Sequence, residues 1–135
     1  MLVFIYGTLM KGGPNHSILV GVSSWTKKAK FIGDMWIDGA VLYDLGGAPA
    51  LKLLADDEYD IHTKKVHGEL WDVPDEHVTT RLDRLEGHPV LYKRTHIGKH
   101  LDKPVYTYVF AKPLTTSNKI ESGRWNNERF YHEQS

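Results

Sequence analysis

The chain has 135 residues, 41% hydrophobic and 25% charged, which is enough for one globular domain with a buried core. Seventeen basic residues balance seventeen acidic ones, so net charge does not indicate a nucleic-acid or anionic-membrane partner. Cysteine is absent, which excludes disulfides, thiolate zinc sites and cysteine nucleophiles. No apolar run has the length of a transmembrane helix and no signal peptide is visible. The absence of cysteine makes the reducing cytoplasm the expected compartment.

The first segment, LVFIYGTLMKGG over residues 2–13, begins as a buried strand and ends in glycines. One interpretation is a tight turn into the next element. The other is that the main chain contacts a ligand, because glycine lets another group approach the backbone closely. The segment is neither a dinucleotide fingerprint nor a phosphate loop, since it lacks G-x-G-x-x-G and Gly-Lys-Ser/Thr. These residues alone leave both interpretations open.

The next segments predict a short helix followed by a strand-rich region. Apolar spacing predicts the helix over residues 17–22. Residues 29–73 are rich in Val, Ile, Tyr and Trp and are interrupted by turn residues, which is typical of several strands. The pair Asp38-Gly39 lies between two apolar runs and predicts a β-hairpin. Residues 66–73 alternate in the manner of a half-buried strand.

A longer helix is predicted from Glu76 to about Glu86. Asp75 is placed to be its N-cap. Gly87 is the residue expected at the C-cap, and Pro89 prevents the helix from continuing.

Glu86 is the candidate catalytic residue on this helix. Val78, Leu82 and Leu85 share one apolar stripe, and at about 100° per residue Glu86 lies roughly 80° from Val78, at the edge of that stripe. Apolar neighbours and the negative end of the helix dipole would both raise the pKa of this carboxyl, which suits a group that accepts and returns a proton. Acidic residues at helix ends are also common on solvated surfaces, so helix geometry leaves that alternative open.

The rest of the chain predicts two more strands and a tail. Residues 91–97 and 104–110 are predicted to be strands. Residues 115–135 are polar, and we expect them to end in a short helix or in disorder. The expected organisation is one α+β domain over 1–113 with a few short helices, and a C-terminal tail over 114–135 that could pack on the domain.

The histidines do not form a recognisable metal site, although there are eight of them. His96 and His100 are four apart, but they flank Gly98 in a strand and loop, and no His pair has a third ligand at a recognisable spacing. We therefore expect no metal. Several tyrosines could orient a polar substrate if their hydroxyls faced a pocket. These are Tyr6, Tyr43, Tyr92, Tyr106 and Tyr108.

Two motifs together resemble the signatures of the gamma-glutamylcyclotransferase-like superfamily. The first is Tyr6-Gly7-Thr8-Leu9, followed by Gly12, Pro14, Asn15 and His16. The second is Leu82-Asp83-Arg84-Leu85-Glu86-Gly87-His88-Pro89, followed by Tyr92 and Arg94. Residues 46–51 and 68–73 are similar to the spacer elements of the family. The resemblance covers about residues 2 to 111, with the elements in the expected order.

The resemblance implies a small mixed β-barrel flanked by a few short helices, with a cavity near the first loop. It implies that the backbone of Tyr6, Gly7, Thr8 and Leu9 binds a gamma-glutamyl group and that Glu86 is the acid/base. We assign Tyr92 and Tyr108 to the same pocket. The implied reaction releases 5-oxoproline and an amine by attack of the substrate's alpha-amine on its gamma-carbonyl, and it needs no cofactor.

Within the family, Asn15-His16 and His88-Pro89 look most like the gamma-glutamylamine cyclotransferase branch. Trp71 stands where the family often has another aromatic residue, and the chain after Lys112 matches no part of the family pattern. The expected partner is a small-molecule substrate, with no nucleic acid and no membrane, and the expected state is a monomer or weak homodimer.

Two other functions remain open. The chain could be a non-catalytic binding module for a gamma-glutamyl-like molecule, although a binder has no need of a carboxylate in an apolar site. It could also be a biosynthetic enzyme of the same fold that removes a gamma-glutamyl protecting group.

Overall fold

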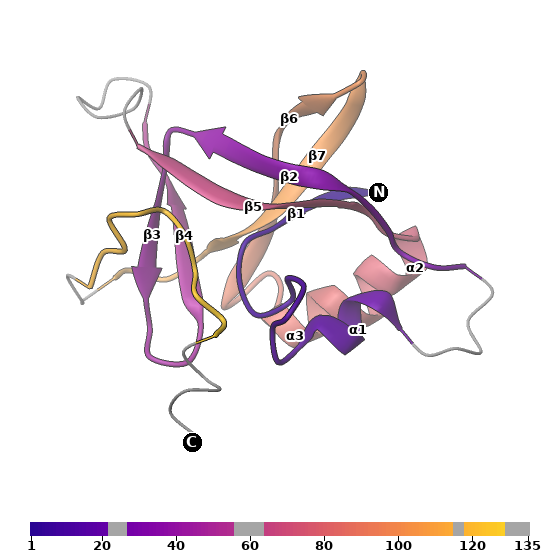
Figure 1. Cartoon of the computed structure of the whole chain (residues 1–135), viewed down its shortest axis with the longest axis horizontal. Helices are drawn as coiled ribbons and strands as arrows, with labels where there is room; N and C mark the ends of the chain where they lie inside the picture. Colours follow the sequence, from indigo (N-terminus) through magenta and orange to yellow (C-terminus); the bar gives the residue numbers. More distant parts are fainter. Residues whose placement is uncertain (22–26, 56–63, 115–117, 129–135) are drawn as a thin grey trace.

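The computed structural model of the chain describes residues 1–21, 27–55, 64–114 and 118–128, which form β-strands and a few short helices (Figure 1). The strands are β1 (Leu2–Ile5), β2 (Lys30–Asp38), β3 (Ala40–Asp44), β4 (Pro49–Leu53), β5 (Lys65–Asp72), β6 (Tyr92–His100) and β7 (Lys103–Phe110). The helical segments are α1 (His16–Val20), α2 (Asp75–His77), η1 (Val78–Leu82) and α3 (Asp83–Glu86). The predicted α+β class is confirmed.

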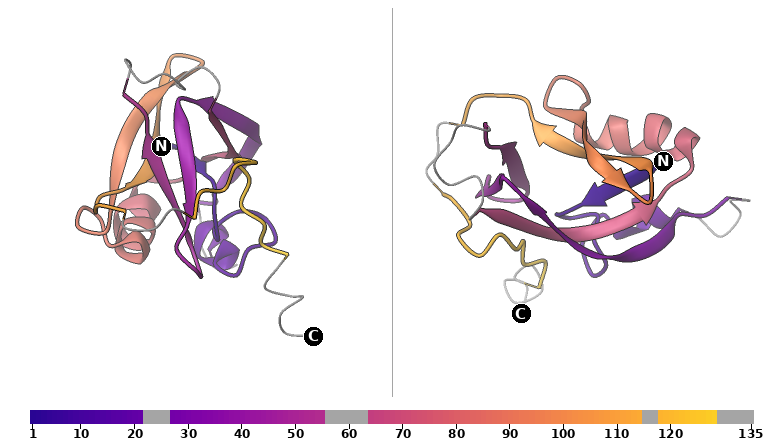
Figure 2. Two further views of the ribbon diagram at one scale, coloured as in Figure 1. Left: turned by 90° about the vertical axis from the view of Figure 1, so that its left-hand side faces the viewer. Right: turned by 90° about the horizontal axis from the view of Figure 1, so that it is seen from above.

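The strands form a five-stranded sheet in the order β2-β5-β1-β7-β6 and a separate two-stranded sheet of β3 and β4. Strand β1 pairs antiparallel with β5 and parallel with β7. Figures 1 and 2 show β3 and β4 at one end of the molecule and the helices near the other, with β2 and β5 strongly curved. The large sheet ends at β2 and β6 and is not closed, so the predicted barrel is an open, curved sheet.

The predicted hairpin at Asp38-Gly39 is wrong. Strand β2 ends at Asp38 and β3 begins at Ala40, but β2 pairs with β5 and β3 pairs with β4. Gly39 has a φ of 69°, in the left-handed region, and its N–H donates to the carbonyl of Lys64 at 2.8 Å. The dipeptide therefore turns the chain from one sheet into the other, because strand pairing is set by tertiary contacts as well as by the turn.

The core forms around β1, a central strand of the large sheet, whose four residues are all buried within the hydrophobic core. The short helix predicted over 17–22 is present as α1, where Leu19 is fully buried. Val22, the last residue predicted in that helix, lies outside the described residues. Among the residues that the structure describes, no helix has the length and hydrophobicity that a bilayer crossing requires.

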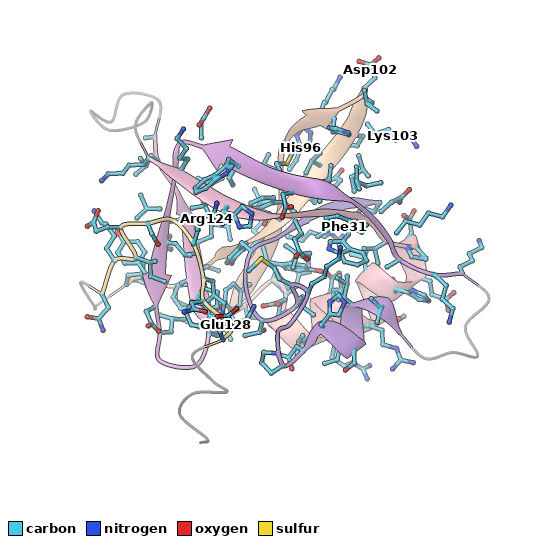
Figure 3. The ribbon with its side chains drawn as sticks, in the orientation of Figure 1. Phe31, His96, Asp102, Lys103, Arg124 and Glu128 are labelled. Atoms are coloured by element: carbon cyan, nitrogen blue, oxygen red, sulfur yellow. The ribbon has the colours of Figure 1, made fainter. Side chains whose placement is uncertain are left out.

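The segment 118–128 runs back over the domain as irregular chain and contributes one isolated β-bridge, from Lys119 to Tyr43. The N–H of His67 donates to the carbonyl of Gly123 at 2.8 Å. Further along the segment the side chains of Trp125 and Asn127 are buried. Figure 3 shows this segment, with Arg124 and Glu128 labelled, beside β3 and β4. This part of the predicted tail thus packs on the domain, and it contains no helix in its described residues.

Candidate active site

The helix that carries Glu86 contains a π turn. Segments α2, η1 and α3 follow one another without a break, as predicted for residues 76–86. The N–H of Asp83, however, donates to the carbonyl of Val78 five residues earlier, whereas an α-helix bonds to the residue four earlier. The π turn therefore holds one residue more than an α turn.

This extra residue decides which side chain faces inward. In a regular α-helix, Leu85 would lie about 20° from Val78, and Glu86 would lie at the edge of the apolar stripe. After a π turn, Glu86 occupies the position that the regular helix gives to Leu85. Accordingly, Val78 and Leu82 are fully buried, Leu85 is 39% exposed, and Glu86 lines a pocket. The prediction that Leu85 lies on the buried stripe is wrong, and Glu86 faces inward more directly than predicted.

The ends of this helix differ in how well they were predicted. Asp75 is not the N-cap: Pro74 occupies that position, and Asp75 Oδ1 instead accepts a hydrogen bond from the Met1 ammonium at 3.1 Å. Gly87 is the C-cap, as predicted, with a left-handed φ of 65°. The helix therefore ends directly after Glu86, and its last side chain lies where the chain turns toward β6.

A pocket lies at the end of β1, enclosed by the first loop, β4, α3, β6 and β7. Its empty volume is about 350 Å³, counted out to its open mouth. The structure brings all seven predicted site residues to this pocket: Tyr6, Gly7, Thr8, Leu9, Glu86, Tyr92 and Tyr108. Four lining residues were not predicted, namely Phe4, Ile5, Ala48 and Pro49. The last two belong to the segment 46–51. Its similarity to a spacer element of the family is the sequence feature that could have indicated them.

Glu86 is the acidic residue of the pocket wall, and its side chain is half-buried. Burial raises the pKa of the Glu86 carboxyl from an ordinary value of 4.5 to about 7. The carboxyl is therefore divided between its ionised and protonated forms near neutral pH. A group in this state can both accept a proton and donate one.

Three tyrosine hydroxyls are held by hydrogen bonds to the protein. Tyr6 donates to the carbonyl of Tyr108 at 2.6 Å, and Tyr92 donates to the carbonyl of Pro49 at 2.7 Å. Tyr108 donates to Asp83 Oδ1 at 2.6 Å. Because each hydroxyl carries a single proton, these tyrosines can offer a ligand only an acceptor oxygen, which suits an ammonium or amide N–H.

The charge of Glu86 also acts on the tyrosines. The pKa of Tyr6 and of Tyr92 is raised by burial and, to a smaller extent, by the nearby Glu86 carboxylate. Both phenols therefore remain neutral while Glu86 titrates. Asp83, which fixes Tyr108, also forms an ion pair with Arg94 Nη1. Sequence reasoning did not assign a role to this pair, although both residues lie in or beside the second motif.

The first loop presents backbone donors at the pocket. The carbonyl of Gly7 accepts a hydrogen bond from the N–H of Met10 at 3.0 Å, which closes a turn. In the described part of the chain, the N–H groups of Gly7, Thr8 and Leu9 donate to no protein acceptor. Successive unpaired N–H groups of this kind can bind a carboxylate or a carbonyl oxygen.

Glycine at position 7 also has a packing role. A Cβ atom added there would lie 2.6 Å from Cγ of Pro49, well inside contact distance. The bare backbone thus allows the loop to pack against β4, in addition to any close approach of a ligand.

Comparison of the whole sequence with known protein families gives a match over most of the chain. Residues 3–127 match the family described as "Gamma-glutamyl cyclotransferase, AIG2-like". The chain belongs to this family. The expectation that the chain after Lys112 lies outside the family pattern is therefore wrong, because the match extends to residue 127.

Two curated relatives support the assignment. A protein of Vibrio cholerae is 34% identical over 125 residues, covering 92% of this chain and 94% of its own length. A protein of Methanocaldococcus jannaschii is 30% identical over 132 residues, covering 94% of this chain and 97% of its own length. Both names give gamma-glutamylcyclotransferase as a provisional activity.

Solved structures agree with the fold. The solution structure of ytfP from Escherichia coli matches with a TM-score of 0.67 and 28% identity, covering 96% of this chain and 99% of that one. The crystal structure of a mouse AIG2-like protein matches with a TM-score of 0.65 and 24% identity, covering 84% of this chain and 79% of that one. The mouse likeness shows the fold alone.

Two residues of the first family motif form hydrogen bonds to the first loop. Asn15 donates its side-chain amide to Thr8 Oγ1 at 3.0 Å. His16 Nδ1 lies 2.9 Å from the carbonyl of Leu9, which can only accept, so this nitrogen carries the proton. Neither residue lines the pocket, and both hold loop residues that do.

Glu69 is a buried carboxylate near the loop that accepts hydrogen bonds from the protein. Its Oε1 accepts hydrogen bonds from the backbone N–H of Lys11 at 3.1 Å and from Trp71 Nε1 at 3.0 Å. Glu69 does not line the pocket. Among the described residues, no cluster of three or more His, Asp or Glu side chains is arranged to hold a metal ion.

Proposed function

We propose that this protein is a gamma-glutamylcyclotransferase that releases 5-oxoproline and a free amine or amino acid from a gamma-glutamyl amine or dipeptide. Family membership supports the reaction class. The observation that carries the proposal is Glu86, a half-buried carboxyl with a pKa raised to about 7, in the same pocket as the backbone N–H groups of the first loop.

In the proposed mechanism, the Glu86 carboxylate accepts a proton from the alpha-ammonium of the substrate. The freed amine attacks the gamma-carbonyl carbon, and a new C–N bond closes the five-membered ring. The bond from that carbon to the leaving nitrogen then breaks, and Glu86 returns its proton to the departing amine. The ring nitrogen gives up its second proton, which leaves with the released amine as an ammonium, so the ring product is the neutral lactam of 5-oxoproline. One carboxyl therefore serves both transfers, for which a pKa near neutrality is well suited.

The remaining acceleration comes from position and charge. The nucleophile and electrophile belong to one molecule, so holding the substrate in a near-attack geometry removes much of the entropic barrier. Negative charge that develops on the gamma-carbonyl oxygen would be stabilised by N–H groups of Gly7, Thr8 and Leu9. The acceptor oxygens of Tyr6, Tyr92 and Tyr108 would orient the alpha-amine.

The narrower proposal is that the substrates are gamma-glutamyl amines. Its support is the resemblance of Asn15-His16 and His88-Pro89 to that branch. Both pairs adjoin the site: His16 holds the first loop, and His88 Nδ1 accepts the backbone N–H of Arg94 at 2.9 Å.

The proposal is tested by incubating the purified protein with a panel of gamma-glutamyl amines and dipeptides and measuring 5-oxoproline. Release of 5-oxoproline with an equal amount of amine supports it. A substrate N-acetylated on the alpha-amine lacks the nucleophile and should release nothing. Release of glutamate instead would mean hydrolysis by water. Binding of 5-oxoproline without turnover of any substrate would favour the binding module.

A further inference from the structure

Asn127 lies in the C-terminal segment, yet its side chain contacts the loop of the first motif. The side chain is buried, and its Nδ2 donates to the carbonyl of Gly7 at 3.1 Å. On the other side, Trp125 Nε1 donates to Asn127 Oδ1 at 3.0 Å. An indole N–H can only donate, so it selects the oxygen end of the amide and leaves the NH₂ end facing Gly7. The orientation of the Asn127 amide is therefore set by the fold.

The carbonyl of Gly7 thus accepts two hydrogen bonds, one from Asn127 and one from the N–H of Met10. In the described residues the one cis peptide bond is His88-Pro89, so the Gly7–Thr8 peptide is trans. In a planar trans peptide, the N–H points opposite to the carbonyl. The N–H of Thr8 therefore points away from Asn127, and it has no protein acceptor within the described residues.

We infer that Asn127 is a positioning residue for catalysis, which holds the Gly7–Thr8 peptide so that the Thr8 N–H stays directed at the bound gamma-glutamyl group. Two bonds to the carbonyl restrain rotation of the peptide plane. They also polarise the peptide, which strengthens its N–H as a donor. The catalytic consequence rests on the proposed function, whereas the orientation of the peptide does not.

The chain supplies a matched pair of variants for the test. Asn127→Asp has nearly the same shape and keeps an acceptor for Trp125, but the ionised carboxylate cannot donate to Gly7. Asn126→Asp makes the same charge change at the adjacent residue, whose side chain is exposed and accepts the N–H of Glu128 at 2.9 Å. Asn127→Ser, which removes the amide without adding charge, serves if Asn127→Asp does not fold.

Turnover and 5-oxoproline binding are measured per folded protein, with the folded fraction taken from circular dichroism. We expect Asn127→Asp to lower kcat/KM by about fivefold or more, the effect of losing one hydrogen bond, and Asn126→Asp to stay within about twofold of the parent. We also expect the Thr8 amide resonance to move on 5-oxoproline binding in the parent and in Asn126→Asp, and not in Asn127→Asp. Equal kcat/KM for the two variants per folded protein would overturn the inference.

The inference can fail separately from the proposed function. If the parent protein releases no 5-oxoproline from any substrate, the proposed function fails. The Thr8 amide resonance of the ligand-free protein still reports the peptide orientation, and it should differ from the parent in Asn127→Asp but not in Asn126→Asp. A Thr8 resonance that is the same in all three proteins would overturn the positioning role whatever the substrate.

Discussion

The N–H of Asp83 bonds to the carbonyl of Val78 across a π turn, and this one bond pattern explains the inward direction of Glu86. With regular α bonding, Leu85 would face the core and the carboxylate would lie at the rim of the buried stripe. The π turn exchanges the two positions, exposing an apolar side chain and burying an ionisable one. Both changes disfavour folding, which is consistent with a site retained for chemistry.

Length changes in the π turn test this explanation. Deleting Thr80, which is exposed, should convert the turn to regular α geometry while leaving the glutamate seven residues after Val78, on the buried stripe. Inserting one alanine after Thr80 should instead rotate the glutamate outward by about 100°. We expect the deletion to keep turnover within about tenfold of the parent and the insertion to lose at least about a hundredfold, the size of a general-base effect. Equal losses in the two variants would contradict the role of the π turn.

Gly7 is expected to be required for packing. In Gly7→Ala the new Cβ would meet Pro49, so the loop or β4 must shift, and we expect a loss of about 1 to 3 kcal/mol in the free energy of unfolding. Gly33→Ala is the control, because no atom lies within 4 Å of a Cβ there, and it should change stability by less than about 0.5 kcal/mol. Urea unfolding measures both. A Gly7→Ala protein as stable as Gly33→Ala would show that the loop accommodates the added Cβ without a steric cost, which would contradict the packing role of Gly7.

The raised pKa of Glu86 predicts how stability depends on pH. The folded pKa, about 7, is above the ordinary value of 4.5, so between these values the folded state binds the proton more tightly than the unfolded state. The stability that Glu86 contributes is therefore fully present below about pH 4.5 and is lost as pH rises through 7. Glu86→Gln should have nearly the parent's stability at pH 4.5 and exceed it by about 1 to 3 kcal/mol at pH 8.

Urea unfolding of the parent and Glu86→Gln across this pH range gives the difference directly. Glu76→Gln, on the exposed first turn of the same helix, is the control and should follow the parent at every pH. A stability difference between parent and Glu86→Gln that does not change from pH 4.5 to 8 would mean that the pKa of Glu86 is not raised.

Much of the site was predictable because its parts are local in sequence. The strand over Leu2–Ile5, the glycine-containing loop after it and the helix end at Gly87 are each encoded by neighbouring residues. Helical spacing placed Glu86 at the edge of the buried stripe, and the family resemblance indicated it as the acid/base. These local features converge on one pocket in the structure.

The remaining features depend on tertiary contacts that no local pattern carries. Asp38-Gly39 is a good hairpin signal, but β2 finds its partner in β5, far along the chain. The extra residue of the π turn leaves the apolar pattern close to that of an ordinary helix. Asn127 reaches the first loop only through the path of the C-terminal segment, which has no periodicity that indicates where it packs.

The pH dependence of turnover should follow the same carboxyl. The mechanism starts from the Glu86 carboxylate, so kcat/KM should fall about tenfold per pH unit below the free-enzyme pKa of about 7. Raising the pH above that value should give a plateau until the alpha-amine of the substrate loses its proton. Initial rates of 5-oxoproline release at low substrate concentration, from pH 5 to 9, provide the profile. A profile without an acid limb in this range would exclude Glu86 as the base.

The most direct test of the whole account is turnover by Glu86→Gln, measured with its melting temperature on the same preparation. The amide has nearly the shape of the carboxyl but cannot accept the ammonium proton. We expect 5-oxoproline release to fall by about 10² to 10⁴-fold or more, because both proton transfers use this residue. The melting temperature and 5-oxoproline binding should match or exceed those of the parent. Glu86→Gln that turns over substrate at the parent rate would contradict the account.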